Sequence, residues 1–101
     1  MSDPHLSICI VSWNTRDLLK DCLESIYSDP EAVRWQVIVV DNASSDDSAA
    51  MVRAHFPATL LVSLNANEGF VGANNIAMGV ARAPYWLLLN SDTRVEQGAL
   101  G

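Results

Sequence analysis

Four short apolar runs, separated by segments of helical length, constrain the fold of this chain more than any other feature. They are rich in β-branched or aromatic residues, as strands are. The runs are LSICIV (6–11), WQVIVV (35–40), TLLVSL (59–64) and YWLLL (85–89). Because they are continuous rather than alternating, we expect strands covered on both faces, with the fourth run fully buried.

The first gap between the runs has the periodicity of an amphipathic helix. Apolar residues from Leu18 to Tyr27 recur on one helical face, and Asn14 or Thr15 is available as the N-cap. The sequence Ser-Asp-Pro at 28–30 predicts the end of this helix.

The other two gaps also predict helices. In the second, Ser44 and Ser45 are candidate caps for a helix whose first turn carries the acidic pair 46–47 and which stops at Pro57. In the third, small and apolar residues form a helical stripe over 73–80. The predicted order is therefore β-α-β-α-β-α-β.

This order predicts an α/β fold, a Rossmann-like parallel sheet with flanking helices and right-handed crossovers. In open sheets of this kind, ligands bind beyond the carboxyl ends of the strands, where the strand order reverses. Polar residues follow every predicted strand: Ser12, Trp13 and Asn14; Asp41 and Asn42; Asn65 and Asn67; Asn90, Ser91 and Asp92. We therefore expect one polar crevice at this edge of the sheet.

Composition narrows the class of protein. The chain has 101 residues, half of them hydrophobic, which is enough for one domain. A net charge of −6 without any Lys/Arg cluster argues against nucleic acid as a partner. No run reaches the roughly 18 apolar residues of a membrane span, and the N-terminus does not resemble a signal peptide, so we expect a cytoplasmic location.

Cys9 and Cys22 are expected to be small core residues rather than a disulfide.

Several common site motifs are missing. The first run is not followed by the glycine-rich phosphate loops of dinucleotide-binding or P-loop proteins, and no G-x-S-x-G elbow occurs. His5 and His55 fall on a tail and at a helix end, where we expect solvated side chains. The side chains that follow the predicted strands include carboxylates, amides and an indole. These groups are suited to binding a nucleobase, a ribose and one hard cation that is held on a diphosphate.

Four segments, ICIVSWN (8–14), VIVVDNASSDDS (37–48), NEGFVGANNIAMG (67–79) and WLLLNSDT (86–93), carry a resemblance. In this order they resemble the successive motifs of family 2 glycosyltransferases of the GT-A fold, closest to rhamnosyltransferase-like members. The resemblance extends from Leu6 to Val95. It implies that residues 6–101 are the N-terminal, nucleotide-sugar-binding half of a GT-A domain, preceded by a disordered tail over 1–5.

The resemblance assigns roles at the end of the first predicted strand. Ser12, Trp13 and Asn14 match the segment that lies along the nucleoside, and Trp13 stands where an aromatic side chain stacks on the base. The alternative for Trp13 is a core tryptophan. Trp35 and Trp86 are interpreted as core residues.

Asp41 and Asn42 match the acidic pair that hydrogen-bonds the base and ribose in this family. The second acid is replaced here by an amide. Because an amide both donates and accepts whereas a carboxylate only accepts, the replacement could change the base preference.

Asn90, Ser91 and Asp92 fall on the D-x-D motif of the family, with the first acid replaced by Asn90. Asp92 occupies the position of the more constant metal contact, which implies Mn²⁺ or Mg²⁺ bridging this carboxylate to the diphosphate. The alternative is that Asp92 caps a following helix.

In the segment 67–79, Asn67 and Asn74 provide polar side chains beside the ligand. Gly69 and Gly72 permit unusual φ values or a close approach of the backbone. Gly72 could instead be small because the helix packs tightly on the sheet.

The resemblance implies an inverting, metal-dependent transfer of a sugar from a UDP-, dTDP- or GDP-linked donor to an acceptor hydroxyl in glycan synthesis. We find no candidate general base within the chain, so we expect a truncated fragment that is inactive alone and self-associates through uncovered apolar surface. The acceptor glycan, and any membrane association, belong to the longer parent. A non-catalytic nucleotide- or partner-binding module is the alternative; a receiver domain is disfavoured because Lys20 is the only lysine.

Overall fold

The computed structural model describes residues 4–92, and its elements follow the predicted order with one short 3₁₀-helix added. The elements are β1 (Leu6–Ser12), α1 (Arg16–Tyr27), η1 (Pro30–Arg34), β2 (Trp35–Asp41), α2 (Ser48–His55), β3 (Leu60–Ser63), α3 (Gly69–Val80) and β4 (Tyr85–Asn90). Each strand begins and ends within one residue of its predicted position. None of the helices in this part of the chain has the length and apolar character required to span a membrane.

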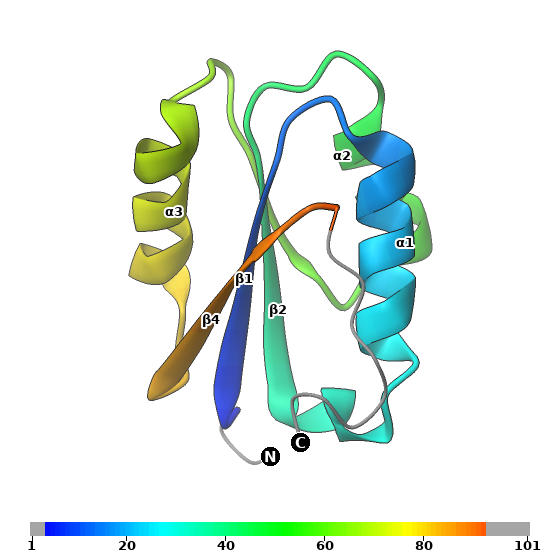
Figure 1. Ribbon diagram of the computed structural model, residues 1–101, viewed down its shortest axis with the longest axis vertical. Helices are drawn as coiled ribbons and strands as arrows, with labels where there is room; N and C mark the ends of the chain where they lie inside the picture. The colour runs from blue at the N-terminus through cyan, green and yellow to red at the C-terminus, as the bar shows by residue number, and fades with distance from the viewer. Residues whose placement is uncertain (1–3, 93–101) are drawn as a thin grey trace.

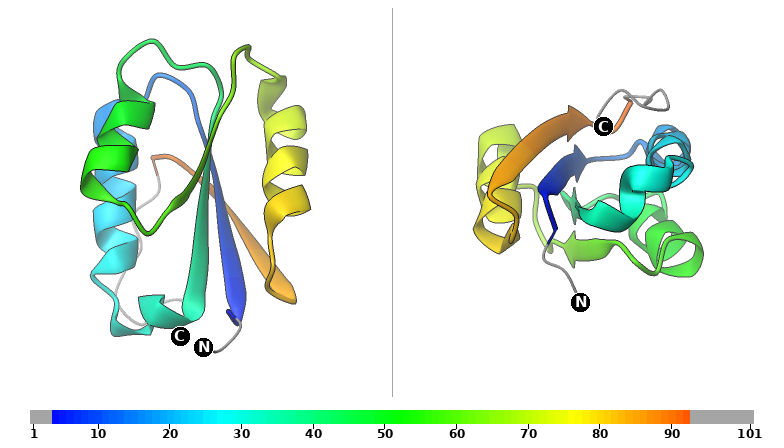
Figure 2. Two further views of the ribbon diagram at one scale, coloured as in Figure 1. Left: turned by 180° about the vertical axis from the view of Figure 1, so that it is seen from behind. Right: turned by 90° about the horizontal axis from the view of Figure 1, so that it is seen from below.

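The strands form one parallel sheet in the order β3-β2-β1-β4. Helix α3 covers one face of the sheet, and α1 and α2 lie together on the other (Figures 1 and 2). This arrangement confirms the predicted α/β, Rossmann-like fold. Because all the strands run in one direction, their carboxyl ends meet at the same edge of the sheet.

The core has two halves, one on each face of the sheet. Toward α1 and α2 it contains Ile8, Ile10, Leu19, Cys22, Leu23, Ile26, Val37, Val39, Met51 and Val52. Toward α3 it contains Cys9, Ile38, Val40, Ala73 and Ala77. Successive residues of β1 and β2 therefore enter opposite halves, which confirms burial on both faces for these two central strands.

Both cysteines are free and buried, as predicted. Burial raises the pKa of the Cys9 thiol. Burial, with a smaller contribution from the negative charge of Asp92, raises the pKa of Cys22 to about 11. Both thiols therefore stay protonated near neutral pH and act as small apolar side chains.

The prediction of a fully buried fourth strand is wrong. β4 lies at the edge of the described sheet and pairs only with β1, while α3 packs on β1 and β2. Tyr85, Trp86 and Leu88 are exposed, and Trp86, with 54% of its surface accessible, is not the predicted core residue. Leu87 and Leu89 are half-buried on the other face.

The second helix begins later than predicted. It starts at Ser48, so its first turn carries no acidic residue, and Asp47 precedes it with a left-handed φ of 64°. Ser44 and Ser45 do not cap it, because they bond to the loop that follows β1. Leu18, assigned to the apolar face of α1, is 49% exposed.

A buried polar network closes the amino-terminal edge of the sheet. The Ser7 hydroxyl donates to Gln36 Oε1 at 2.8 Å, and the same oxygen accepts the Arg82 backbone N–H at 2.8 Å. The Ala83 N–H donates to the Ser7 hydroxyl at 3.1 Å. Two strand side chains thus satisfy the backbone of the connection from α3 to β4, which fixes where β4 enters the sheet.

The tail predicted over residues 1–5 falls largely on 1–3, which lie outside the described residues. His5 is exposed, and its N–H donates to the Arg34 carbonyl at 2.9 Å. The chain is therefore attached to the end of η1 just before β1 begins. His55 is also exposed.

Candidate functional site

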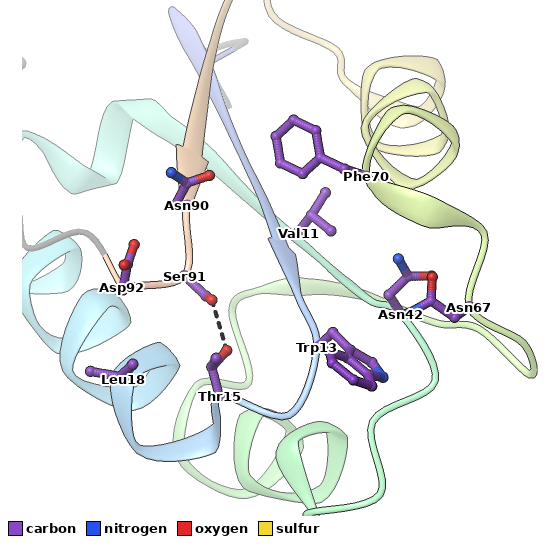
Figure 3. A pocket seen from close by; sticks show the side chains of 10 residues that line it. All are labelled: Val11, Trp13, Thr15, Leu18, Asn42, Asn67, Phe70, Asn90, Ser91 and Asp92. Atoms are coloured by element: carbon purple, nitrogen blue, oxygen red, sulfur yellow. Dashed lines mark hydrogen bonds between the residues drawn. The ribbon is translucent and has the colours of Figure 1, made fainter.

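A pocket of about 370 Å³ opens at the carboxyl ends of the strands, beside the end of β1 and the end of β4 (Figure 3). It is lined by Val11, Trp13, Thr15, Leu18, Asn42, Asn67, Phe70, Asn90, Ser91 and Asp92. The chain leaves β1 for β2 on one side and returns to β4 on the other. The pocket therefore occupies the position where strand order reverses, as expected for a ligand site of this fold.

The structure brings some of the predicted site residues into this pocket and not others. Trp13, Asn42, Asn67, Asn90, Ser91 and Asp92 line it. Ser12, Asn14, Asp41, Gly69 and Asn74 lie outside its lining. Ser12, Asp41 and Asn74 are buried, and the Ser12 hydroxyl contacts the lining residue Thr15.

A chain of hydroxyl groups joins the two strands that flank the pocket. Ser12 Oγ lies 3.1 Å from Thr15 Oγ1, which lies 2.7 Å from Ser91 Oγ; either hydroxyl can donate in each pair. Thr15 holds the N-cap position of α1 but makes no side-chain cap bond to the helix. Its hydroxyl instead ties the end of β1 to the end of β4 and holds the pocket floor together.

Asn14 links two loops rather than facing the pocket. Its N–H donates to Ser44 Oγ at 2.9 Å, and its Oδ1 accepts the Ser45 N–H at 2.8 Å. Asn14 has a φ of 52°, a left-handed conformation that asparagine tolerates. These bonds fasten the loop after β1 to the loop after β2.

Asp46 supplies the cap that Thr15 does not. Its Oδ2 accepts the Arg16 N–H at 3.0 Å, and Ser48 donates to its other oxygen. Desolvation acts to raise the pKa of this carboxyl, but these hydrogen bonds together outweigh it and lower the pKa. A carboxylate from the second loop thus stabilises the start of α1.

Asp41 combines deep burial with an unused acceptor. It is 2% exposed, and its Oδ2 accepts the Ser44 N–H at 3.2 Å. Its Oδ1 has no hydrogen-bond partner among the described residues. A buried carboxylate oxygen is costly without a donor, so a donor that reached this atom would be bound favourably, although Asp41 itself lies outside the pocket lining.

Asn42 is held by the start of α3. Its Nδ2 donates to the Gly69 carbonyl at 3.2 Å, and its Oδ1 accepts the Glu68 N–H at 2.7 Å. Gly69 has a φ of +75°, which explains the glycine there. A Cβ on Gly72 would lie 3.2 Å from Glu68 Cβ, so Gly72 meets its own helix, and it is Ala73 and Ala77 that pack in the core.

Two aromatic side chains stand on the pocket wall. Trp13 is 55% exposed, so it is not a core tryptophan, and Phe70 is 59% exposed (Figure 3). Trp35 is half-buried against the core, in keeping with its predicted role. An exposed indole and phenyl ring beside polar groups can hold a planar ring system.

Four lining residues escaped prediction: Val11, Thr15, Leu18 and Phe70. Phe70 carries a usable signal, because it directly follows Gly69 at the start of a predicted helix whose core positions are small residues. The sequence pattern predicts Thr15 only as a helix cap and Leu18 only as a core residue. Nothing in the local sequence shows that their side chains lie at a strand-end pocket.

The pocket has one carboxylate among its described lining residues, Asp92, which is exposed. Within residues 4–92 no three His, Cys, Asp or Glu side chains gather as a complete metal cage. One carboxylate and the amide of Asn90 on the same pocket lining nevertheless suit a hard cation that takes its remaining ligands from phosphate and water. The helix that Asp92 was alternatively predicted to cap lies outside the described residues.

Comparisons by sequence bear on this geometry. The family model described as glycosyl transferase family 2 matches residues 7–101. Succinoglycan biosynthesis protein ExoO of Rhizobium meliloti is 33% identical over 98 residues, covering 96% of this chain and 28% of that protein. Poly(ribitol-phosphate) beta-glucosyltransferase of Bacillus spizizenii is 28% identical over 100 residues, covering 94% of this chain and 16% of that protein.

Solved structures agree on the fold. TarS 1–349 of S. aureus in complex with UDP superposes with a TM-score of 0.85 at 22% identity, over 95% of this chain and 30% of that one. The mannosyltransferase PcManGT of Pyrobaculum calidifontis, in complex with GDP-Man and Mn²⁺, gives 0.78 at 23% identity, over 93% and 29%. The chain therefore spans less than a third of the length of these relatives.

Proposed function

The chain belongs to glycosyl transferase family 2, and from this membership we propose that it is the donor-binding part of an inverting, metal-dependent glycosyltransferase. The donor is a nucleoside diphosphate sugar, and the acceptor is a hydroxyl group of a growing cell-surface polysaccharide or glycan. The single observation that carries the proposal is the pocket at the strand-order reversal, where Trp13, Asn67 and Asp92 converge.

The chemistry of the pocket supports a nucleotide donor. Trp13 and Phe70 offer aromatic faces for a base. Asp41 lies outside the pocket lining, and its role as an acceptor for the nucleoside rests on the resemblance to the family and on its unpartnered Oδ1. Solved relatives are complexed with UDP, UDP-GlcNAc and GDP-Man, which supports the same ligand class here.

The proposed reaction is a direct displacement at the anomeric carbon. The acceptor oxygen forms the new bond as the bond to the diphosphate breaks, and the acceptor proton passes to a base outside residues 4–92. Asp92 and Asn90 would hold the cation, whose charge neutralises the leaving diphosphate. The pocket walls orient the nucleotide end of the donor.

Isothermal calorimetry with UDP and dTDP tests the proposal. We expect saturable binding by the 101-residue chain and no turnover of a nucleotide sugar by this chain alone, because the proposed base lies outside it. Absence of binding to UDP, dTDP and GDP, in the presence of Mn²⁺, would contradict the proposed function.

Replacing Asp41 with alanine is expected to weaken UDP binding by about tenfold to a hundredfold while the fold persists. The reason is the loss of one charge-assisted hydrogen bond, worth about 1.5–3 kcal/mol. Asp21→Ala, which removes an exposed carboxylate on α1, is the control for the change in net charge. Calorimetry and circular dichroism check both variants; an unfolded Asp41→Ala variant whose folded fraction binds normally would assign Asp41 to structure.

Self-association of the chain is a further prediction. β4 has one pairing partner in the described sheet, and Trp86 and Leu88 expose apolar surface on the α3 side of the sheet, where α3 packs on β1 and β2 but leaves β4 uncovered. An open strand edge with exposed apolar side chains favours pairing with a second copy. Light scattering should show dimers that Trp86→Lys abolishes and Val33→Lys, at a residue exposed on η1, does not. A monodisperse wild-type monomer at all concentrations would disprove it.

A further inference from the structure

Asn42 is almost fully buried, and its side-chain amide bonds to the backbone at the start of α3. Its own N–H donates to the Ser12 carbonyl at 2.8 Å, which holds its backbone against the end of β1. Its side chain donates to Gly69 and accepts from Glu68, as described above. Asn42 therefore bonds to the end of β1 through its backbone and to the start of α3 through its side chain.

The turn into α3 depends on side-chain oxygens. The N-cap residue Glu68 makes no side-chain cap bond. Instead, the Glu68 N–H is bonded by Asn42, and the Gly69 N–H donates to Asn67 Oδ1 at 2.7 Å. Glycine at position 69 permits the left-handed φ but also many other conformations, so hydrogen bonds must select the observed one.

Glu68 and Gly69, which Asn42 holds by hydrogen bonds, are flanked by two residues that line the pocket. Asn67 precedes Glu68, Phe70 follows Gly69, and both line the pocket (Figure 3). We propose that Asn42 is a positioning residue: its paired hydrogen bonds to Glu68 and Gly69 seat Asn67 and Phe70 on the pocket wall and thereby set the affinity for the nucleotide. This inference rests on the proposed function.

The chemistry of position 42 explains why an amide stands there. An amide presents a donor to the Gly69 carbonyl and an acceptor to the Glu68 N–H. A carboxylate retains the acceptor but places a second oxygen against the Gly69 carbonyl. Asn42→Asp should therefore break the hydrogen bond to the Gly69 carbonyl and loosen the turn into α3, without removing atoms from the core.

The experiment combines UDP affinity, by calorimetry with Mn²⁺, and amide hydrogen exchange in the 101-residue chain. In Asn42→Asp we expect about tenfold weaker UDP binding, because the binding-competent fraction falls in proportion. Exchange at Glu68 and Gly69 should accelerate by a similar factor while amides of β1 and β2 keep wild-type rates. Asn75→Asp, at an exposed position of α3, makes the same charge change and should affect neither.

A neutral variant separates positioning from charge. Asn42→Ser adds no charge, and its side chain is too short to reach both backbone groups. It should therefore show the same weaker UDP binding and the same faster exchange at Glu68 and Gly69. If Asn42→Asp does not fold, this variant provides the test. Wild-type UDP affinity in Asn42→Ser, or unchanged exchange at Glu68, would overturn the proposal. If the wild-type chain binds no nucleotide, the proposed function fails, and the positioning role for nucleotide affinity fails with it. Faster exchange at Glu68 in the variants, with unchanged exchange in β1 and β2, would still show that Asn42 holds the turn into α3.

Discussion

Truncating Leu23 to alanine is expected to lower the free energy of unfolding by about 2–5 kcal/mol. Leu23 is fully buried on α1, where it packs with the half of the core that faces β1 and β2. Its removal leaves a cavity that neighbouring side chains fill only in part. Because a small domain has about 5–15 kcal/mol of stability, this one change could remove a large share of it.

Urea unfolding followed by circular dichroism measures this effect, and the same helix provides the control. Leu18 is the same residue type on α1 but is 49% exposed, so Leu18→Ala should cost about 1 kcal/mol or less. Equal losses in the two variants would show that α1 is not packed on the sheet as described.

Mn²⁺ is expected to strengthen UDP binding by at least about tenfold, or about 1.4 kcal/mol, and Asp92→Asn to abolish this gain. The protein carries a net charge of −6, and the described pocket lining contains neither lysine nor arginine. A diphosphate would otherwise be repelled, so a cation held by Asp92 has a large electrostatic role.

Calorimetry with Mn²⁺ and with excess chelator provides the two arms of this test. Asp21→Asn, which removes an exposed charge on α1, should keep the full response to Mn²⁺. A response that survives in Asp92→Asn would assign the cation to other groups. Identical wild-type affinity in chelator would remove the metal from the proposal.

The strands and the polar edge were predictable because they depend on local pattern. A parallel sheet places Trp13, Asn42, Asn67 and Asp92 at one edge once four strands are recognised. The exposure of Trp86 was not predictable, because a continuous apolar run reads the same at the edge of a sheet as at its centre. Edge or centre depends on the strand order, which no single segment encodes.

Long-range hydrogen bonds account for most of the remaining errors. Ser44 was a reasonable helix cap by its spacing, but it bonds to Asn14, and this pairing is visible only once β1 and β2 lie side by side. Asn42 lines the pocket as expected, but its hydrogen bonds to Glu68 and Gly69 could not be read from the local sequence. Local propensity decides such positions only when no distant partner competes.

The strand order also has a consequence for how the chain reaches its native state. β1 pairs with β2, which follows after one helix, and with β4, which is the last strand described. The β1–β2 unit can assemble with α1 early, whereas the β1–β4 ladder must wait until the intervening segments have been synthesised and ordered. Closing so long a loop is entropically costly, so docking of β4 should come late on the folding pathway. During synthesis one edge of β1 thus stays open, and mutations in β4 should accelerate unfolding more than they slow folding.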